Sequence, residues 1–321
     1  MRTRLVYLAV IVMVLIGCTG CTTETELTKI NLPMGYVANV QFTPFYMAQE
    51  RDYFQKAGFD VNFDYRWETD GIQLVAAGEI PFAVASGDQV IQARSQGLPV
   101  VAVAAWYQRF PVAIIALEST LLRSPEDLRG LSIGIPETFG ASYIGLRALL
   151  KAGGLTEADI DLQAIGYTQL AALTAGTVDA VVVYANNEPV VLAQEGIPFN
   201  SLYVADYAQI VSAVVVSNDT MVEEQPEIVR AFVDAFLKGL QDVLDDPDTA
   251  FEISKKHIEG LEENAPAQRA VLETSIDYWS APDLGRFDVD SWQQAQSVMA
   301  ETGLIEQTMP VESLFTNKFV Q

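Results

Sequence analysis

The feature that most constrains the fold of this chain is a succession of short helix, glycine and apolar strand that occurs twice along the sequence. Residues 74–78 form a short helical stretch that ends at glycine and precedes an apolar strand at 82–84, and residues 170–176 and 180–182 repeat this order. Strands that alternate with helices predict sheets covered by helices on both faces. A chain of 321 residues also exceeds the size at which one hydrophobic core usually keeps growing. The sequence therefore predicts an α/β fold with two doubly wound lobes.

Hydrophobic periodicity places the elements of both lobes. Short apolar or alternating runs indicate strands, and apolar spacings of three and four indicate helices. The predicted strands cover residues 29–32, 61–65, 82–85, 100–105, 131–135, 161–165 and 178–183, and the predicted helices cover 44–56, 89–96, 142–151, 226–240, 267–279 and 289–302. We expect the C-terminal helices to pack on the first lobe.

Two further apolar runs, at 111–115 and 211–216, flank the second repeat and are interpreted as strands that link the lobes. If the chain leaves the first lobe through one run and returns through the other, the first lobe is discontinuous. The predicted boundaries are then 27–112 and 214–321 for lobe 1 and 113–213 for lobe 2, with a hinge at the two crossings. The alternative is that both runs are core strands of one large sheet.

The N-terminus has the pattern of a lipoprotein export signal. Arg2 and Arg4 precede an apolar run at 5–16, and a small residue precedes Cys18. The run is too short to cross a bilayer core, which needs roughly twenty residues. We therefore predict a signal peptide at 1–17 that is cleaved before the cysteine.

Cleavage there would leave Cys18 to carry lipid on a tether at 18–26, at the extracytoplasmic face of the cell membrane. Each buried methylene of the lipid adds about 0.8 kcal/mol of membrane affinity. Cys21 is the competing site, and an uncleaved apolar terminus is the alternative to processing. No later apolar run reaches membrane-spanning length without interruption, so the anchor is the predicted membrane contact.

Charge and cysteine content exclude several classes of function. Without Arg2 and Arg4 the chain carries 17 basic and 42 acidic side chains, a formal charge of −25 that disfavours nucleic acids and anionic surfaces. Both cysteines precede residue 22, so the folded part has neither a disulfide nor a thiol nucleophile. We expect no nucleic-acid partner.

Motifs for catalysis and cofactor binding are missing from the sequence. The lone histidine, His257, lies in a charged helical stretch, where we expect a surface residue rather than the base of a triad. The acidic pairs at 245–246 and 262–263 are typical of solvated helix faces. There is no closely spaced set of zinc ligands, no phosphate-binding loop and no dinucleotide fingerprint. The sequence predicts a protein with no catalytic residue, metal or cofactor.

Polar and aromatic residues collect where the predicted strands end, which is where ligands bind in open α/β sheets. Taken alone, each such residue has a simpler role in closing the core or capping a helix. Together they predict an interlobe cleft for a flat heteroaromatic ligand, since rings stack on aromatic side chains while amides and carboxylates pair with ring N–H and carbonyl groups. The candidate binding residues are Tyr36, Asn39, Gln41, Phe42, Trp67, Asp70, Gln89, Trp106, Arg109, Tyr143, Tyr184, Asn187, Glu188 and Asp206. Arg109 is the main cation among them, which argues against an anionic ligand.

Several segments carry a resemblance to a known family. They are FYMAQE at 45–50, DYF at 52–54, GFDV at 58–61, QGLPV at 96–100, GTVDA at 176–180, NEP at 187–189 and FTNKF at 315–319. Through them the predicted mature chain resembles, nearly end to end, the solute-binding lipoproteins of ABC importers in the ThiY-like group, which binds thiamine pyrimidine precursors. Within this group, NVQF at 39–42 and WETDG at 67–71 are more similar to the riboflavin-binding branch, RibY.

The resemblance implies a two-lobed periplasmic-binding-protein fold that closes on a vitamin-sized ligand and delivers it to a permease driven by a cytoplasmic ATPase. It also implies that Glu188 reaches the ligand. Pyrimidine binders usually show Trp-Thr-Pro-Asn and a nearby histidine early in the chain, whereas residues 34–39 here are MGYVAN. We therefore expect a non-enzymatic receptor for riboflavin or a related heteroaromatic vitamin. The alternatives are the same architecture with a thiamine pyrimidine precursor as ligand, and a pyrimidine-forming synthase, which would need histidine and cysteine near the cleft.

Overall fold

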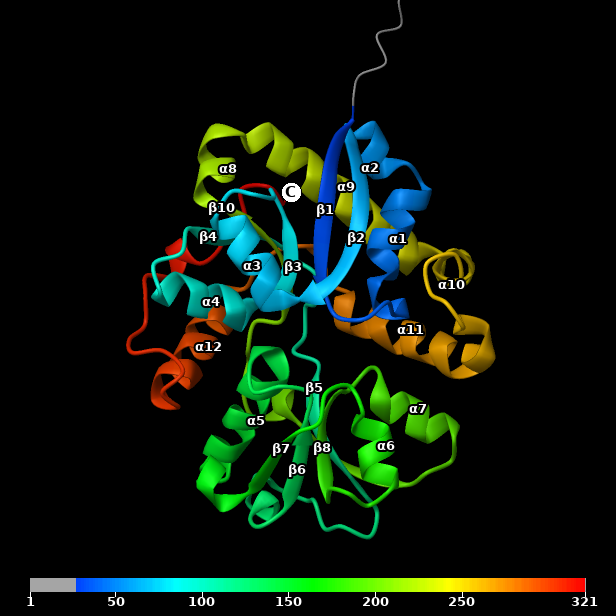
Figure 1. Cartoon of the computed structure of the whole chain (residues 1–321), viewed down its shortest axis with the longest axis vertical. Coiled ribbons are helices and arrows are strands. Elements are labelled where there is room, and N and C mark those ends of the chain that lie inside the picture. The colour runs from blue at the N-terminus through cyan, green and yellow to red at the C-terminus, as the bar shows by residue number, and fades with distance from the viewer. Residues whose placement is uncertain (1–26, 321) are drawn as a thin grey trace, which may run out of the picture.

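The computed structural model describes residues 27–320, which form two lobes joined by two crossing segments (Figure 1). The first lobe contains a two-stranded and a three-stranded sheet, and the second lobe, at the bottom of the view, contains a five-stranded sheet. In sheet order the strands are β1 (Thr28–Gly35) and β2 (Phe59–Trp67); β3 (Ala83–Ser86), β10 (Ala213–Asn218) and β4 (Val100–Ala105); and β7 (Asp161–Ala164), β6 (Ser132–Ile135), β8 (Ala180–Tyr184), β5 (Val112–Leu117) and β9 (Phe199–Tyr203). The predicted signal peptide, tether and Cys18 lie outside the described residues.

Both lobes contain strands of opposite direction. β10 is antiparallel to β3 and β4, and β5 is antiparallel to β8 and β9, whereas β1 with β2 and β6 with both β7 and β8 are parallel. β5 and β10 are the two apolar runs predicted to link the lobes, and they lie inside different sheets rather than in one large sheet. Strands buried on both faces are apolar throughout, which explains why these runs show no alternation. We propose 27–112 with 214–321, and 113–213, as the two lobes.

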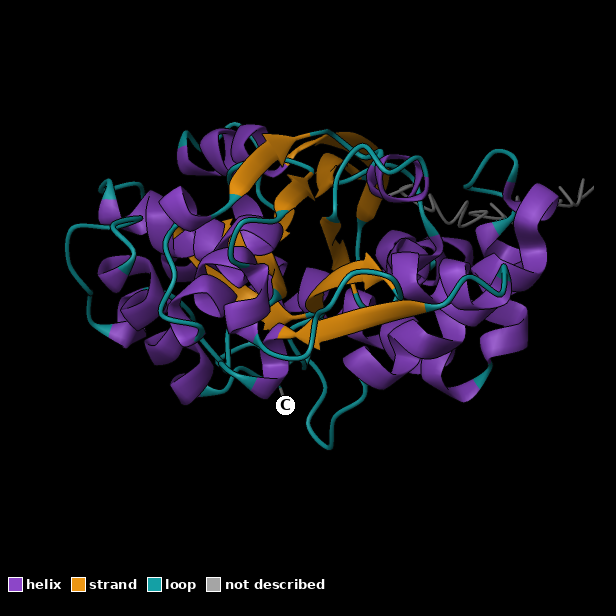
Figure 2. Cartoon of the chain, turned by 90° about the horizontal axis from the view of Figure 1, so that it is seen from below, coloured by secondary structure: helices purple, strands orange, loops and turns teal. Residues whose placement is uncertain are grey.

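Helices lie on both sides of the strands (Figure 2). They are α1 (Thr43–Glu50), α2 (Tyr53–Lys56), α3 (Glu68–Ala76), α4 (Gly87–Ser95), α5 (Gly140–Ala152), α6 (Gln169–Thr174), α7 (Glu188–Gln194), α8 (Asp219–Glu224), α9 (Pro226–Asp245), α10 (Pro247–Ser254), α11 (Ala265–Trp279) and α12 (Val289–Glu301). The helix predicted over 44–56 is divided into α1 and α2, because Asp52 has a left-handed backbone with φ of 58°. Within residues 27–320, every helix is too short or too polar to span a bilayer.

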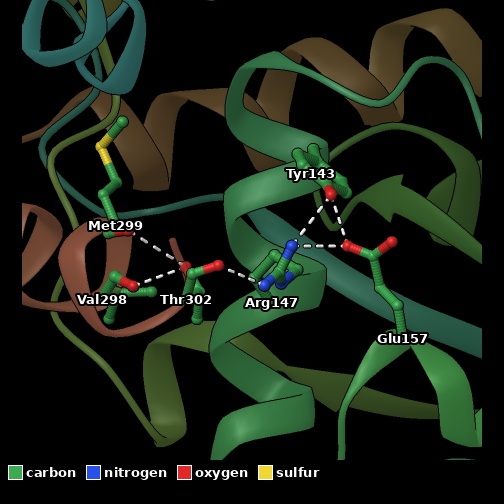
Figure 3. A network of polar contacts seen from close by, with 6 residues as sticks. All are labelled: Tyr143, Arg147, Glu157, Val298, Met299 and Thr302. Carbon is green, nitrogen blue, oxygen red and sulfur yellow. Dashed lines mark hydrogen bonds and ion pairs between the residues drawn. The ribbon is translucent and has the colours of Figure 1, made fainter. Parts of the chain in front are cut away.

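Polar contacts connect the second lobe to the C-terminal helices (Figure 3). Arg147 of α5 pairs with Glu157 and donates a hydrogen bond to the backbone carbonyl of Thr302, which directly follows α12. Lys151 on the same helix pairs with Glu301 at the end of α12. Because α12 also packs on α4 of the first lobe, this network joins the two lobes through the C-terminal part of the chain.

Helix α9 crosses α1 closely, and a glycine permits the approach. Phe236 of α9 stacks on Phe45 of α1 with ring centroids 4.5 Å apart. One turn away, a Cβ atom on Gly239 would lie 2.3 Å from the carbonyl oxygen of Pro44 and 2.7 Å from the Cβ atom of Ala48. Backbone atoms cannot rotate aside as a long side chain does, so the packing of α9 on the first lobe depends on this glycine.

Replacement of Gly239 with valine is expected to lower the free energy of unfolding by about 2 kcal/mol or more, because the added carbon atoms force α9 away from α1. Urea unfolding measures this change. The matched control is Lys238→Val, which adds the same side chain at the exposed neighbouring position of the same helix. Equal losses of stability in the two variants would contradict this description of the packing.

Candidate ligand-binding site

A cavity of about 90 Å³, which we call the inner cavity, lies between the lobes where strands of both lobes end. Its lining follows β1, β2 and β4 in the first lobe and β6, β7 and β8 in the second. The residues that line it are Met34, Gly35, Tyr36, Gln41, Phe42, Glu68, Val84, Trp106, Tyr107, Pro136, Glu137, Phe139, Gly140, Ala141, Ser142, Tyr167, Gln169, Tyr184, Asn187, Glu188 and Ala213. This position agrees with the general rule that ligands bind beyond the carboxyl ends of strands.

Trp106 is the centre of an aromatic group on the first lobe. Its ring lies 5.3 Å from Phe42, tilted by 30°, and 5.3 Å from Phe45 in edge-to-face geometry. Tyr107 contacts it at 5.0 Å. The Nε1 atom of Trp106 and the Nε2 atom of Gln41 are buried and have no hydrogen-bond partner among the described residues. Because buried donors are nearly always paired, these two N–H groups are candidates to bind carbonyl oxygens of a ligand.

Aromatic rings of opposite lobes meet across the inner cavity. Tyr36, which follows β1, contacts Tyr167, which follows β7, edge to face with centroids 4.5 Å apart. Trp67, the last residue of β2, lies 6.1 Å from Phe139 and 5.4 Å from Tyr167. These ring contacts join the two lobes and would break if the lobes separated.

Two carboxyl groups of the first lobe lie at helix starts, where Asp88 is buried and Glu68 is half-buried. The Oε2 atom of Glu68, on α3, accepts a hydrogen bond of 2.6 Å from the Ser86 hydroxyl, and Asp88, on α4, accepts one of 3.3 Å from Gln89. Burial, with repulsion from Asp88 as the second cause, raises the pKa of Glu68 to about 8, and burial raises the pKa of Asp88 to about 6. A Cβ atom on Gly140 of α5 would lie 3.6 Å from Glu68 Oε2, so this carboxyl group reaches the second lobe.

The second lobe contributes two further carboxyl groups. Glu188 opens α7 and is 8% exposed, and its Oε2 atom accepts a hydrogen bond of 3.0 Å from the backbone N–H of Tyr184. Glu137 accepts one of 3.2 Å from the Tyr167 hydroxyl. Burial raises the pKa of Glu137 and of Glu188 to about 7. The protonation state of both carboxyl groups therefore changes near neutral pH.

The inner cavity offers acceptors without a positive counter-charge. None of its described lining residues is lysine, arginine or histidine. Burial of a sulfonate or phosphate without a cation is costly, so the lining suits a neutral ligand that donates N–H or O–H groups. Among the described residues, no cluster of three or more histidine, cysteine, aspartate or glutamate side chains is arranged to hold a metal ion.

Half of the residues predicted to bind the ligand line the inner cavity, which brings together side chains from both lobes. These are Tyr36, Gln41, Phe42, Trp106, Tyr184, Asn187 and Glu188. Two more lie beside it: Asn39 lines an adjoining groove, and Trp67 contacts two rings of the cavity wall. Their contact with a ligand stays a prediction.

The other five predicted residues lie elsewhere. Arg109 and Asp206 line a separate hollow of about 300 Å³ between the two crossing segments. Gln89 lines a groove between α3 and α4, and Asp70 is exposed on α3. Tyr143 lies in the α5 network of Figure 3. The main predicted cation is therefore outside the inner cavity, which strengthens the argument against an anion there.

The prediction omits several residues that the structure places in the cavity wall. Glu68, Tyr107 and Phe139 lie in strand-end segments and line the inner cavity, but they are not among the candidate binding residues. Glu137 lies shortly after β6 and Tyr167 shortly after β7, where the same strand-end rule predicts ligand-binding residues.

Comparison with known proteins relates the chain to two kinds of receptor. A family model described as NMT1/THI5 like matches residues 39–250. The riboflavin-binding protein RibY of Chloroflexus aurantiacus is 37% identical and is matched over 100% of this chain and 98% of its own. A formylaminopyrimidine-binding protein of Halalkalibacterium halodurans is 30% identical over 98% of both chains.

More distant matches extend to enzymes and to the fold as a whole. A 4-amino-5-hydroxymethyl-2-methylpyrimidine phosphate synthase of Legionella pneumophila is 22% identical over 91% of this chain and 92% of its own. Among solved structures, the periplasmic aliphatic sulphonate binding protein SsuA of Escherichia coli has a TM-score of 0.72 at 15% identity, over 90% of this chain and 91% of its own. The predicted periplasmic-binding-protein fold is thereby confirmed.

The raised pKa of Glu68 predicts a stability that falls with rising pH. Between its ordinary value of 4.5 and about 8, the folded protein holds a proton that the unfolded chain has released, so the free energy of unfolding decreases as pH rises through this range. Glu68→Gln, which mimics the protonated form, is expected to flatten that decrease and to exceed the wild type by at least about 1 kcal/mol at pH 9. Chemical unfolding from pH 5 to 9 measures both curves.

The control is Glu79→Gln, which neutralises an exposed carboxylate outside the inner cavity. Its stability curve should follow the wild type after a constant offset. A Glu68→Gln curve with the same slope as the wild type would show that this carboxyl group is ionised in the folded protein at neutral pH.

Proposed function

This chain belongs to the NMT1/THI5-like family, and we propose that it is a lipid-anchored receptor that captures riboflavin between its lobes and delivers it to an ABC importer. Its fold is shared with the ligand-binding component of an ABC-type import system. The observation that carries the proposal is the inner cavity, where aromatic rings, unpaired donors and buried carboxyl groups meet without a cation among the described lining residues. The 37% identity to a riboflavin-binding protein supports the choice of ligand.

The chemistry of riboflavin matches this lining. Its isoalloxazine ring is flat, and one edge carries two carbonyl groups on either side of an N–H. The ring stacks on the group around Trp106 and Phe42, at roughly 0.5–1.5 kcal/mol for each ring pair beyond burial. Trp106 Nε1 and Gln41 Nε2 donate to the carbonyl oxygens, and Glu188 accepts from the N–H. A ligand that leaves any of these groups unpaired loses about 1–3 kcal/mol for each.

Capture requires the lobes to move. The inner cavity of about 90 Å³ is well below the roughly 300–1,000 Å³ of pockets that hold drug-sized ligands. Separation of the lobes breaks the contacts of Tyr36 with Tyr167 and of Trp67 with Phe139. A bound flavin replaces these ring contacts with its own, and its differential affinity for the closed form then favours closure.

The alternative ligand is a thiamine pyrimidine precursor, since a relative 30% identical to this chain is a formylaminopyrimidine-binding protein. A single ring would require less separation of the lobes. It would also leave part of the aromatic surface formed by Phe42, Trp106, Tyr107 and Tyr184 uncovered. We therefore favour the tricyclic flavin.

We propose a non-enzymatic role, although distant relatives are named as synthases. His257 stacks on Tyr46 with centroids 4.4 Å apart, and its Nε2 atom lies 3.2 Å from Glu50 Oε1. Its side chain is 14% exposed, so the predicted surface histidine is in fact largely covered by neighbours. It does not line the inner cavity, and residues 27–320 contain no cysteine. The groups expected of a synthase are thus not at the site.

The proposed anchor is Cys18, with the mature protein held at the extracytoplasmic face of the cell membrane. β1 begins at Thr28, a short distance along the chain from this cysteine. The tether therefore keeps the first lobe near the membrane, where an ABC permease and its ATPase would receive the ligand. The lipid supplies the membrane contact, since the acidic chain is not attracted to anionic lipid headgroups.

Riboflavin added to ligand-free protein that begins after Cys21 is expected to lose its fluorescence stoichiometrically at submicromolar concentrations, because the flavin stacks on aromatic side chains. FMN, which differs by a terminal phosphate, should bind at least about tenfold more weakly, since no lining cation compensates its charge. Fluorescence titration measures both affinities. Equal affinity for the two flavins would contradict the preference for a neutral ligand, and no quenching by either would contradict flavin binding.

Lipid attachment at Cys18 predicts a labelling pattern. In a bacterial host fed with labelled palmitate, the wild type and Cys21→Ser are expected to incorporate the label, whereas Cys18→Ser is not, because it lacks the thiol that accepts the lipid. Gel fractionation and detection of the label measure incorporation. Loss of label in Cys21→Ser but not in Cys18→Ser would assign the anchor to the second cysteine instead.

A further inference from the structure

A second hollow, which we call the outer groove, adjoins the inner cavity. It measures about 430 Å³, and Tyr36, Tyr167, Gln169, Asn187 and Glu188 line both spaces. The rings of Tyr36 and Tyr167 meet edge to face at 4.5 Å, so this pair forms the partition between cavity and groove. Because the two tyrosines come from opposite lobes, separation of the lobes joins the two spaces into one.

The outer groove differs from the inner cavity in its chemistry. Apart from the two tyrosines of the partition, no described aromatic residue lines it, and side-chain amides take their place. Asn39 uses its Oδ1 atom to accept a hydrogen bond of 3.0 Å from the backbone N–H of Gln41, which leaves its Nδ2 donor for other partners. Gln268 extends into the groove from α11, and Glu188 is the one carboxylate in the described lining. The groove is therefore polar and contains no lysine, arginine or histidine among its described residues.

We propose that the outer groove binds the polyhydroxyl side chain of the ligand while the inner cavity binds its ring, an inference that rests on the proposed flavin ligand. Hydroxyl groups donate and accept hydrogen bonds, and so do the amides of Asn39, Gln169, Asn187 and Gln268. Glu188 lies at the passage between the two spaces, where the ring in the inner cavity meets the side chain in the outer groove. A neutral polyol satisfies this lining, whereas a ring alone would leave the amides to water.

The position of the outer groove also connects the side chain to closure. Gln268 lies on α11 in the C-terminal part of the chain, and Asn187 directly precedes α7 of the second lobe. α7 and α11 pack on one another, so the groove lies beside an interlobe contact. A polyol bound there bridges both lobes and adds to the preference for the closed form.

The test compares riboflavin with lumiflavin, which keeps the ring but has a methyl group in place of the polyol. Fluorescence quenching of the ligand-free protein should show riboflavin binding at least about tenfold more tightly than lumiflavin. Gln268→Leu, which removes the amide, and Ala171→Trp, which fills the exposed groove wall, should each weaken riboflavin about fivefold or more and leave lumiflavin within about twofold. The matched control is Gln73→Leu, an exposed glutamine on α3 outside the groove, which should change neither affinity.

Each outcome separates this inference from the proposed function. Equal wild-type affinity for riboflavin and lumiflavin, or variants that leave riboflavin unchanged or weaken both flavins equally, would overturn the assignment of the groove while riboflavin binding stands. Failure of the wild type to bind either flavin would overturn the proposed function itself. Thermal unfolding of Gln268→Leu and Ala171→Trp tests whether each variant is folded. We expect both to fold, because neither position is fully buried.

Discussion

Burial of carboxyl groups without a neighbouring cation is the constraint that governs this site. Glu68 and Glu188 are held by hydrogen bonds from the Ser86 hydroxyl and the Tyr184 backbone, each at the start of a helix. These contacts offset only part of the cost of removing a charge from water, so the pKa of Glu68 rises to about 8 and that of Glu188 to about 7. Such a cavity has no cation among its described lining residues to pair with an anion, and it forms hydrogen bonds with neutral N–H and O–H groups, which is the basis for proposing riboflavin.

The two-lobed fold produces this arrangement because strands of both lobes end at the same gap. β4 leads directly into Trp106, and β8 ends at Tyr184 shortly before Glu188, so aromatic and acidic groups face each other from different lobes. The network of α5 with α12 joins the lobes through the C-terminal helices, while ring contacts such as Tyr36 with Tyr167 are those that ligand access would break. Recognition and lobe movement therefore depend on the same side chains.

The hydrophobic pattern of the sequence predicts the strands that are fully buried but misses one that is partly exposed. β4 is predicted at its observed bounds because all its residues are apolar, whereas β9 goes unpredicted because this edge strand is half exposed and mixes polar with apolar residues. In the site, the strand-end rule predicts that the segment at 67–70 contributes to ligand binding, but it cannot tell which side chain of the segment points to the cavity. Because α3 begins at Glu68, Asp70 is exposed to solvent. Arg109 and Asp206 lie on the crossing segments, whose path depends on tertiary contacts rather than local pattern.

The most direct test of the central claim is calorimetric competition on refolded, ligand-free protein. Riboflavin is titrated into the protein alone and into protein saturated with a formylaminopyrimidine. This account predicts binding of one riboflavin per chain, with the same affinity in both titrations, because the aromatic cavity is specific for the larger ring. Heat of binding from the pyrimidine together with loss of the riboflavin signal would contradict it and identify the chain as a pyrimidine receptor.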